Sequence, residues 1–345
     1  MITRDGGNGD YEIYDLGSNT ILAAGPLGQV GFEWQVAGLG GFAGADNSDM
    51  LLRNRNTGAL EVYDISNNNI NNAAPMGQVG LEWSVAGFGD FSSRAGETDM
   101  LMRNSNTGAF EIYDISNNAI TSAGRMGQVG LEWSVAGFGD FSTRAAETDM
   151  LMRNASTGVF ELYDITNNQI TSAQSMGQVG SEWSVAGFGD FSGNANETDM
   201  LMRNNNTGAF EIYDISNNAI VSAAPMGQVG LEWQVADFGS INSAGAADML
   251  MRNGNTGAFE LYDISNNQIT SAAPMGQIGL EWSVTGIASD PPGGSGPAIS
   301  AQIAQAIASS APTGGAPSPS LSFERVAMQP VPNLFASSPG TSYPT

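Results

Sequence analysis

A repeat of about 50 residues constrains this chain more than any other feature of its sequence. Six tryptophans are spaced 49, 50, 50, 50 and 49 residues apart, and nearly the same text surrounds each of them. They are Trp34, Trp83, Trp133, Trp183, Trp233 and Trp282. A period near 50 fits a propeller blade of four strands, and it is too long for one coil of a β-solenoid.

One repeat predicts four short strands joined by turns. In the second repeat the strands are expected at 83–88, 99–103, 109–115 and 119–123. Asn117 and Asn118 form a two-residue hairpin turn in this interpretation, because asparagine tolerates positive φ. No segment within the repeats has a helical period, so each repeat indicates an antiparallel meander.

The turn between the second and third strands predicts a register for this pair. If Arg103 faces Ala109, then Met102 faces Phe110, and the blade has one apolar and one mixed face. On the mixed face Arg103 lies diagonal to Glu111, and we expect the two to be structural partners. The methionines are expected in the core, since Met fills irregular gaps.

Six such meanders stacked radially bury both faces of each sheet, and closing the ring protects the sheet edges. The sequence therefore predicts an all-β, six-bladed propeller of four-stranded antiparallel blades. The N-terminus matches only the second to fourth strands of a repeat, and the last repeat supplies only a first strand. We expect Glu281–Gly286 to pair with Met1–Arg4 and close the ring as a 3+1 clasp.

The composition changes after the last repeat. The propeller is assigned to residues 1–288 and an irregular tail to 289–345, because 10 of the 14 prolines lie from Asp290 onward. Within the tail a short helix is expected near 298–311, with isoleucines spaced four residues apart. It is interpreted either as a weak helix, docked or frayed, or as an uncleaved secretion signal.

Missing residue types exclude much chemistry. The chain has no cysteine, histidine or lysine, which excludes disulfides, thiolate or imidazole metal sites, His- or Cys-based triads and Schiff-base lysines. A formal net charge of −24 argues against nucleic acid and against an anionic membrane surface. No apolar run reaches the ~18–20 residues of a membrane span, so membrane insertion is not expected.

The text V-A-G-F-G-D-F, followed by T-D-M-L-M-R-N and T-G-A-F, resembles the FG-GAP repeat, also called the VCBS-like repeat. The resemblance covers roughly residues 1–288 in six copies. It implies a propeller like the integrin α-subunit head and certain fungal lectins, an extracellular or surface setting, and adhesion or ligand binding. Members of the family often bind Ca²⁺ in a loop of the form D-x-[DN]-x-D-G-x-x-D.

Three loops are the candidate Ca²⁺ sites that this resemblance implies. Their matching residues are Asp90, Ser92, Asp99, Asp140, Ser142, Asp149, Asp190, Ser192 and Asp199. The loops are one residue longer than the family pattern, and they lack its middle Asp and its Gly. In the alternative interpretation, these aspartates bind loop amides and Arg94 takes the place of the cation.

Other repeated residues are assigned to structure. The tryptophans are expected to wedge between blades, with a sugar-stacking platform as the alternative. Asp114 and its counterparts are expected to cap turns. A hydrolase needs one acid and base pair in unequal environments, and we find no carboxylate that is unique within the ring.

The sequence thus predicts a non-enzymatic, monomeric, secreted or cell-surface module that binds a glycan or protein ligand through multivalent loops. The alternatives are a calcium-stabilised scaffold or spacer and, with less support, a divergent glycoside hydrolase. The N-terminal residues lack the apolar region of a Sec signal, so type I secretion is expected. The competing view is that the chain is a fragment of a larger protein.

Overall fold

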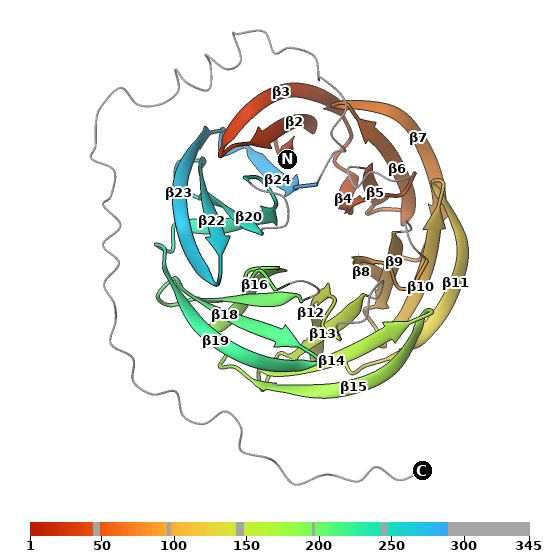
Figure 1. The fold of residues 1–345 in the computed structure, drawn as a ribbon. Helices are drawn as coiled ribbons and strands as arrows, with labels where there is room; N and C mark the ends of the chain where they lie inside the picture. The colour runs from red at the N-terminus through yellow and green to blue at the C-terminus, as the bar shows by residue number, and fades with distance from the viewer. Residues whose placement is uncertain (44–48, 95–97, 143–147, 195–196, 243–246, 289–345) are drawn as a thin grey trace, which may run out of the picture.

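The computed structural model describes residues 1–43, 49–94, 98–142, 148–194, 197–242 and 247–288. They form a six-bladed β-propeller in which every blade is a four-stranded antiparallel sheet, as the repeats predicted (Figure 1). Within these ranges no helix is long and apolar enough to cross a membrane. The helix expected near 298–311 lies outside the described residues.

Each blade runs from an inner strand, which begins at Trp, to a long outer strand. Blade 1 contains β24 (Trp282–Gly286), β1 (Ile2–Asp5), β2 (Asp10–Gly17) and β3 (Thr20–Gln29). Blade 2 contains β4 (Trp34–Gly40), β5 (Asp49–Asn54), β6 (Ala59–Ser66) and β7 (Asn69–Gln78). Blade 3 contains β8 (Trp83–Gly89), β9 (Asp99–Asn104), β10 (Ala109–Ser116) and β11 (Ala119–Gln128).

The remaining three blades repeat this order. Blade 4 contains β12 (Trp133–Gly139), β13 (Asp149–Asn154), β14 (Val159–Thr166) and β15 (Gln169–Gln178). Blade 5 contains β16 (Trp183–Gly189), β17 (Asp199–Asn204), β18 (Ala209–Ser216) and β19 (Ala219–Gln228). Blade 6 contains β20 (Trp233–Gly239), β21 (Asp248–Asn253), β22 (Ala258–Ser265) and β23 (Gln268–Gln277).

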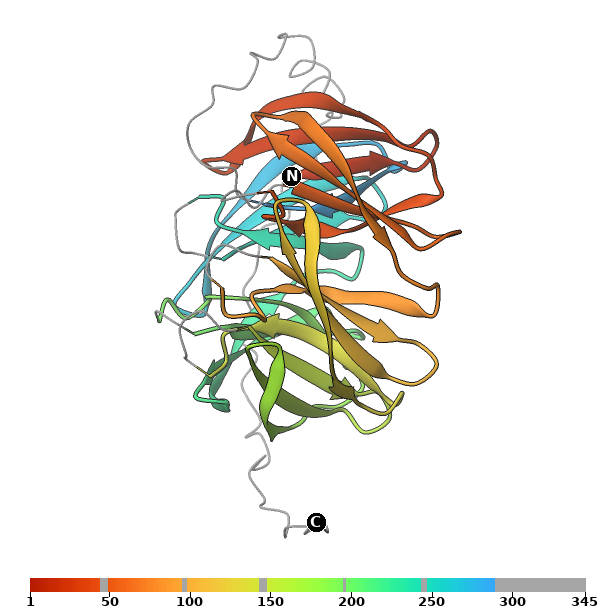
Figure 2. The same cartoon turned by 90° about the vertical axis from the view of Figure 1, so that its right-hand side faces the viewer.

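The strands run up and down between the two faces of the ring, which Figure 2 shows in profile. One face, which we call the turn face, carries the turn after each second strand and the connection that precedes each Trp. In blade 3 these are residues 105–108 and, leading into blade 4, 129–132. The other face, the loop face, carries the segment between the first two strands of each blade and the Asn-Asn hairpins. Both residues of the blade 3 hairpin, Asn117 and Asn118, have positive φ, 50° and 60°, as the sequence predicted.

The predicted register of the two middle strands is wrong by one residue. Arg103 pairs with Phe110, and Met102 pairs with Glu111. The shift arises because Asn104 belongs to the strand and closes a tighter turn: its backbone carbonyl accepts the amide of Gly108 at 2.8 Å, and its Oδ1 accepts two further turn amides. Phe110 therefore lies on the face opposite to Met102.

This register makes both faces of every blade apolar, and adjacent blades share each core. Met100 and Met102 of blade 3 pack against Leu51 and Val62 of blade 2. The other face of blade 3, which includes Phe110, packs against the methionines of blade 4. The half-buried Trp133 contacts the same blade 3–blade 4 cluster, as expected for a wedge between blades.

The ring closes through the predicted clasp. In blade 1, β24 pairs antiparallel with β1: Thr3 faces Val284, and Arg4 faces Ser283. The Oγ1 of Thr285 donates to the carbonyl of Ile2 at 2.9 Å. Three strands from the N-terminal side and one from the end of the last repeat thus complete the sixth sheet (Figure 1).

Candidate functional sites on the two faces of the ring

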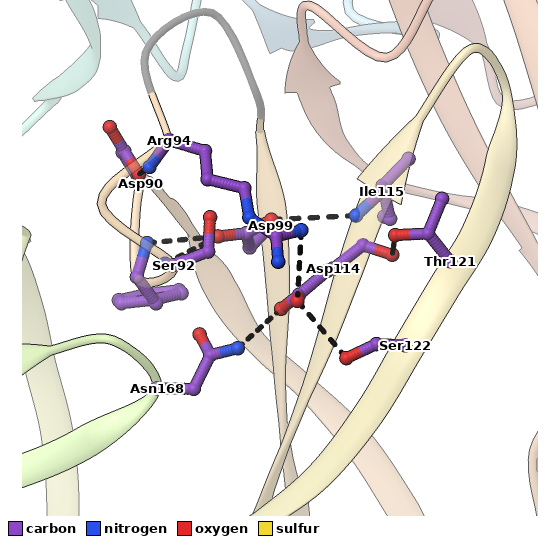
Figure 3. A network of polar contacts seen from close by, with 10 residues as sticks. Asp90, Ser92, Arg94, Asp99, Asp114, Ile115, Thr121, Ser122 and Asn168 are labelled. Atoms are coloured by element: carbon purple, nitrogen blue, oxygen red, sulfur yellow. Dashed lines mark hydrogen bonds and ion pairs between the residues drawn. The ribbon is translucent and has the colours of Figure 1, made fainter.

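On the loop face, Asp99 fastens the loop that precedes it. Its Oδ2 accepts the amides of Phe91 at 3.0 Å and Ser92 at 2.8 Å, and its Oδ1 accepts the amide of Ile115 at 3.4 Å (Figure 3). The side chain is fully buried. In four other blades, Oδ2 of the counterpart aspartate accepts the two corresponding loop amides. These aspartates are Asp49, Asp149, Asp199 and Asp248.

The first aspartate of the loop also accepts a loop amide. The Oδ1 of Asp90 accepts the amide of Arg94 at 3.0 Å, and the Oδ1 of Asp190 accepts the amide of Gly193 at 2.7 Å. These contacts are those of the alternative interpretation of the loops, in which the aspartates bind amides. The remaining predicted residues are Asp140 and Ser142, which occupy the same places in blade 4, and Ser192, whose amide donates to Oδ2 of Asp199 at 2.8 Å.

Asp114 and its counterparts join neighbouring blades. Asp114 is 2 % exposed, and its Oδ1 accepts Nδ2 of Asn168, from the hairpin of blade 4, at 2.6 Å. The equivalent bond recurs at all six joints, so these aspartates do more than cap their own turns. The other five pairs are Asn19–Asp263, Asn68–Asp15, Asn118–Asp64, Asn218–Asp164 and Asn267–Asp214.

Negative charge is concentrated beside these joints. In blade 3 a guanidinium nitrogen of Arg94 lies 3.8 Å from Asp114 Oδ2 (Figure 3). This contact fits the alternative interpretation of the loop, in which Arg94 takes the place of the Ca²⁺ ion. Burial, and less strongly the charge of Asp114, raises the pKa of Asp99 above its ordinary value. Burial raises the pKa of Asp149, Asp199 and Asp248 as well.

Blade 5 differs because Asn194 stands where blade 3 has Arg94. There Asp199 is fully buried, and its Oδ1 has no hydrogen-bond partner among the described residues. Asp214 lies close enough to raise its pKa further. In the described part of the chain, no group of three or more His, Cys, Asp or Glu side chains is arranged to hold a metal ion.

On the turn face, the repeated arginine is bound to the next blade. Arg103 donates from Nη1 to the carbonyl of Trp133 at 2.5 Å and from Nη2 to the carbonyl of Gly130 at 2.8 Å. Its guanidinium also lies 5.3 Å from the ring centroid of Phe110. The expected Arg103–Glu111 partnership is therefore wrong, since Glu111 accepts the hydroxyl of Tyr113 at 3.0 Å.

The connection before each Trp exposes two side chains on the turn face. In the connection from blade 2 to blade 3 these are Leu81, 56 % exposed, and the exposed Glu82. The large apolar residue recurs in five of the six connections, as Phe32, Leu81, Leu131, Leu231 and Leu280. Sequence reasoning missed this ring, although its signal, a bulky residue between Gly and Glu, is visible in the repeats.

Sequence reasoning also missed a carboxylate that is unique in the ring. Asp237 stands on the inner strand of blade 6 where the corresponding strands have glycine, as at Gly187. Its Oδ2 accepts the amide of Ile287 at 2.6 Å and its Oδ1 that of Phe238 at 2.8 Å. These bonds fix the end of the closing strand, so this unique carboxylate has a structural explanation.

Comparison with solved structures supports the architecture. A chain of a nidogen–laminin complex superposes with a TM-score of 0.53 at 13 % identity, over 83 % of this chain and 95 % of that one. An oligogalacturonate lyase in complex with manganese matches with a TM-score of 0.44 at 10 % identity, over 76 % of this chain and 81 % of that one. At 13 % identity, the first of these matches shows the propeller fold alone. No family model matches the sequence, and the search among curated proteins found no match.

Proposed function

We propose that this propeller is a non-enzymatic binding module of a secreted or cell-surface protein, and that its loop face contacts a carbohydrate or protein ligand. A six-bladed propeller is commonly a binding scaffold, and the FG-GAP-like text of the repeats is typical of adhesion proteins. Type I secretion through a signal in the C-terminal tail belongs to the same proposal.

The proposal rests on the hydrogen bonds that the carboxylates of the loop face make within the fold. Asp99 and its counterparts accept backbone amides, and Asp114 and its counterparts accept asparagine side chains across the blade joints. A general acid or base needs a carboxyl group that can reach a substrate proton, and these groups are used by the fold. Among the described residues, the loop face also presents a set of similar Asn-Asn hairpins, repeated around the ring, as a surface for contact.

Repeated weak contacts predict a strong dependence on ligand density. The labelled full-length protein should be applied to glycans and matrix proteins printed at graded densities. We expect retention to rise more steeply than linearly with density, without product release from any glycan. Absence of binding at every density, or turnover of a glycoside, would contradict the proposal.

A calcium-stabilised scaffold is a second candidate, favoured by the buried Oδ1 of Asp199, for which the described ranges contain no hydrogen-bond partner. Calcium prefers oxygen ligands, and an ion that binds only the native state raises its stability by mass action. The test compares melting midpoints in EDTA and in millimolar CaCl₂ for the wild type and D199N. An unchanged wild-type midpoint would leave the aspartates as residues that fasten the loops.

A further inference from the structure

The exposed apolar residues of the turn face are held by a rigid backbone. In the connection to blade 3, the amide of Trp83 donates to the carbonyl of Gly80 at 3.1 Å, and the amide of Ser105 donates to the carbonyl of Glu82 at 2.7 Å. Arg53 of blade 2 also donates to the Gly80 carbonyl, at 2.8 Å. Leu81 thus projects from a turn that is fixed to both blades.

The fold does not require an apolar residue at this place, and blade 5 provides the internal control. Its connection carries Ser181 instead of leucine. The same three bonds are nevertheless present: Trp183 amide to Gly180 carbonyl at 3.1 Å, Asn205 amide to Glu182 carbonyl at 2.7 Å, and Arg153 to Gly180 carbonyl at 2.8 Å. The five bulky residues are therefore not needed for the bonds that hold this turn.

The charges of the two faces differ. On the turn face each exposed glutamate follows the apolar residue, and an arginine of the preceding blade lies near it, as Arg103 lies near Glu132. Negative and positive groups thus alternate around this ring. On the loop face most blades carry two aspartates of the kinds described above, and Arg94 is the only arginine that the described residues place there. The excess negative charge of the molecule is therefore concentrated on the loop face.

We propose that the turn face pairs with the turn face of a second copy of this chain. Two identical rings of apolar residues have the same radius, so they meet in an isologous contact, and the alternating Glu and Arg groups of one ring can face opposite charges in the other. The acidic loop faces then point away from each other, where salt screens their repulsion. This departs from the monomer expected from the sequence.

The available surface suits a stable dimer. A standard interface uses about 20–30 residues on each side. Every blade exposes three residues of its turn, such as Ser105, Asn106 and Thr107, and the connection exposes two more, such as Leu131 and Glu132. Taken with the proposed function, pairing presents two ligand-binding faces in opposite directions, as a protein that bridges two surfaces requires.

Sedimentation equilibrium of the full chain tests the pairing without any ligand. We expect the wild type to sediment at twice 35.9 kDa at micromolar concentration. The triple variant L81S/L131S/L231S copies the natural residue of blade 5, and it should weaken dimerisation by at least about 100-fold. Its melting midpoint should equal that of the wild type at a dilution where both proteins are monomeric. The variant S181L should tighten the dimer.

The matched control removes exposed apolar side chains elsewhere. Leu22 and Val221 are each 60 % exposed on the outer strands β3 and β19, and L22S/V221S should leave the dimer intact. A monomeric wild type at 100 µM, or a dimer that the triple variant does not weaken, would overturn the pairing. So would a monomer captured by neutral phosphatidylcholine vesicles through the same leucines. Because no ligand enters this assay, these results are independent of the binding assay for the proposed function.

Discussion

Replacement of Arg103 by methionine tests how the blades are joined at the turn face. Methionine keeps the apolar stem that covers Phe110 but has no group to donate to the carbonyls of Trp133 and Gly130. The variant R103M therefore removes the hydrogen bonds between blades 3 and 4 at this point and leaves their apolar cluster in place.

The magnitude follows from the geometry. Two well-formed bonds from a charged donor contribute ~1.5 kcal/mol each at a half-buried site, the low end of the range for charged groups. The contact of the guanidinium with the Phe110 ring adds ~0.5–1 kcal/mol. We expect R103M to lower the free energy of unfolding by ~3–4 kcal/mol, and R103K, which loses the forked geometry, by about half of that.

Urea unfolding followed by tryptophan fluorescence measures these differences. The matched control is R125M, because Arg125 is 90 % exposed and its ion pair with Glu111 spans 3.8 Å. Such a surface pair contributes ~0–0.5 kcal/mol to the free energy of unfolding. The variant E111Q tests whether Arg103 acts through Glu111 or through the carbonyls of the next blade. If E111Q costs as much as R103M, or if R103M costs no more than R125M, the inter-blade bonds do not have the energetic role assigned to them.

Three further predictions concern closure, packing and acidity. Deleting residues 1–27 should abolish cooperative unfolding, because β24 loses its partner strand β1. Deleting residues 290–345 should leave the melting midpoint nearly unchanged. Equal effects of the two deletions would contradict the clasp. The variant G137A should lower the free energy of unfolding by ~1–3 kcal/mol, because a Cβ there would lie 2.0 Å from the ring of Phe188. The control G124A, with open space around the added Cβ, should leave it unchanged. Calorimetry of the two variants measures the difference. The raised pKa values of Asp99, Asp149, Asp199, Asp237 and Asp248 mean that the folded state binds more protons than the unfolded state. Their contribution to stability is therefore full below the ordinary Asp pKa and is lost as the pH rises through the folded values. The melting midpoint should therefore rise as the pH is lowered from neutral towards the ordinary Asp pKa, and a falling midpoint would refute this assignment.

Most of the fold was predictable because the same local sequence pattern recurs in every repeat. The Asn-Asn turn, the Trp-led inner strand and the clasp all follow from turn chemistry and from fractions of a repeat. The register was not predictable from strand text alone. It depends on whether Asn104 ends the strand or begins the turn, and the side-chain and backbone bonds of that one residue decide the matter.

The candidate sites were harder to predict, since the decisive contacts join different blades. Asp114 binds a residue 54 positions away, and Arg103 reaches carbonyls 27 and 30 positions away. Within one repeat, both residues have nearer candidate partners for an ion pair or a hydrogen bond. Only the relative position of two neighbouring blades shows that Asp114 faces Asn168 and that Arg103 lies over the connection to Trp133.

Asp237 shows how a departure from the repeat can be explained by its neighbour in the next blade. At four of the other joints the glycine is required by an aromatic ring: a Cβ at Gly187 would lie 2.0 Å from Phe238. At the joint between blades 1 and 2, a Cβ at Gly286 would lie 2.8 Å from Leu39. At the closing joint the residue in the place of that phenylalanine is Ile287, and a smaller aliphatic side chain leaves room for a carboxylate. The chain enters the closing strand from blade 6, and within blade 1 this strand is joined to β1 by pairing alone, without a covalent connection. The carboxylate that accepts the amide of Ile287 fastens the end of this closing strand to the inner strand of blade 6. The two exchanges, Gly to Asp and Phe to Ile, are therefore one structural change, placed at the end of the strand that closes the ring.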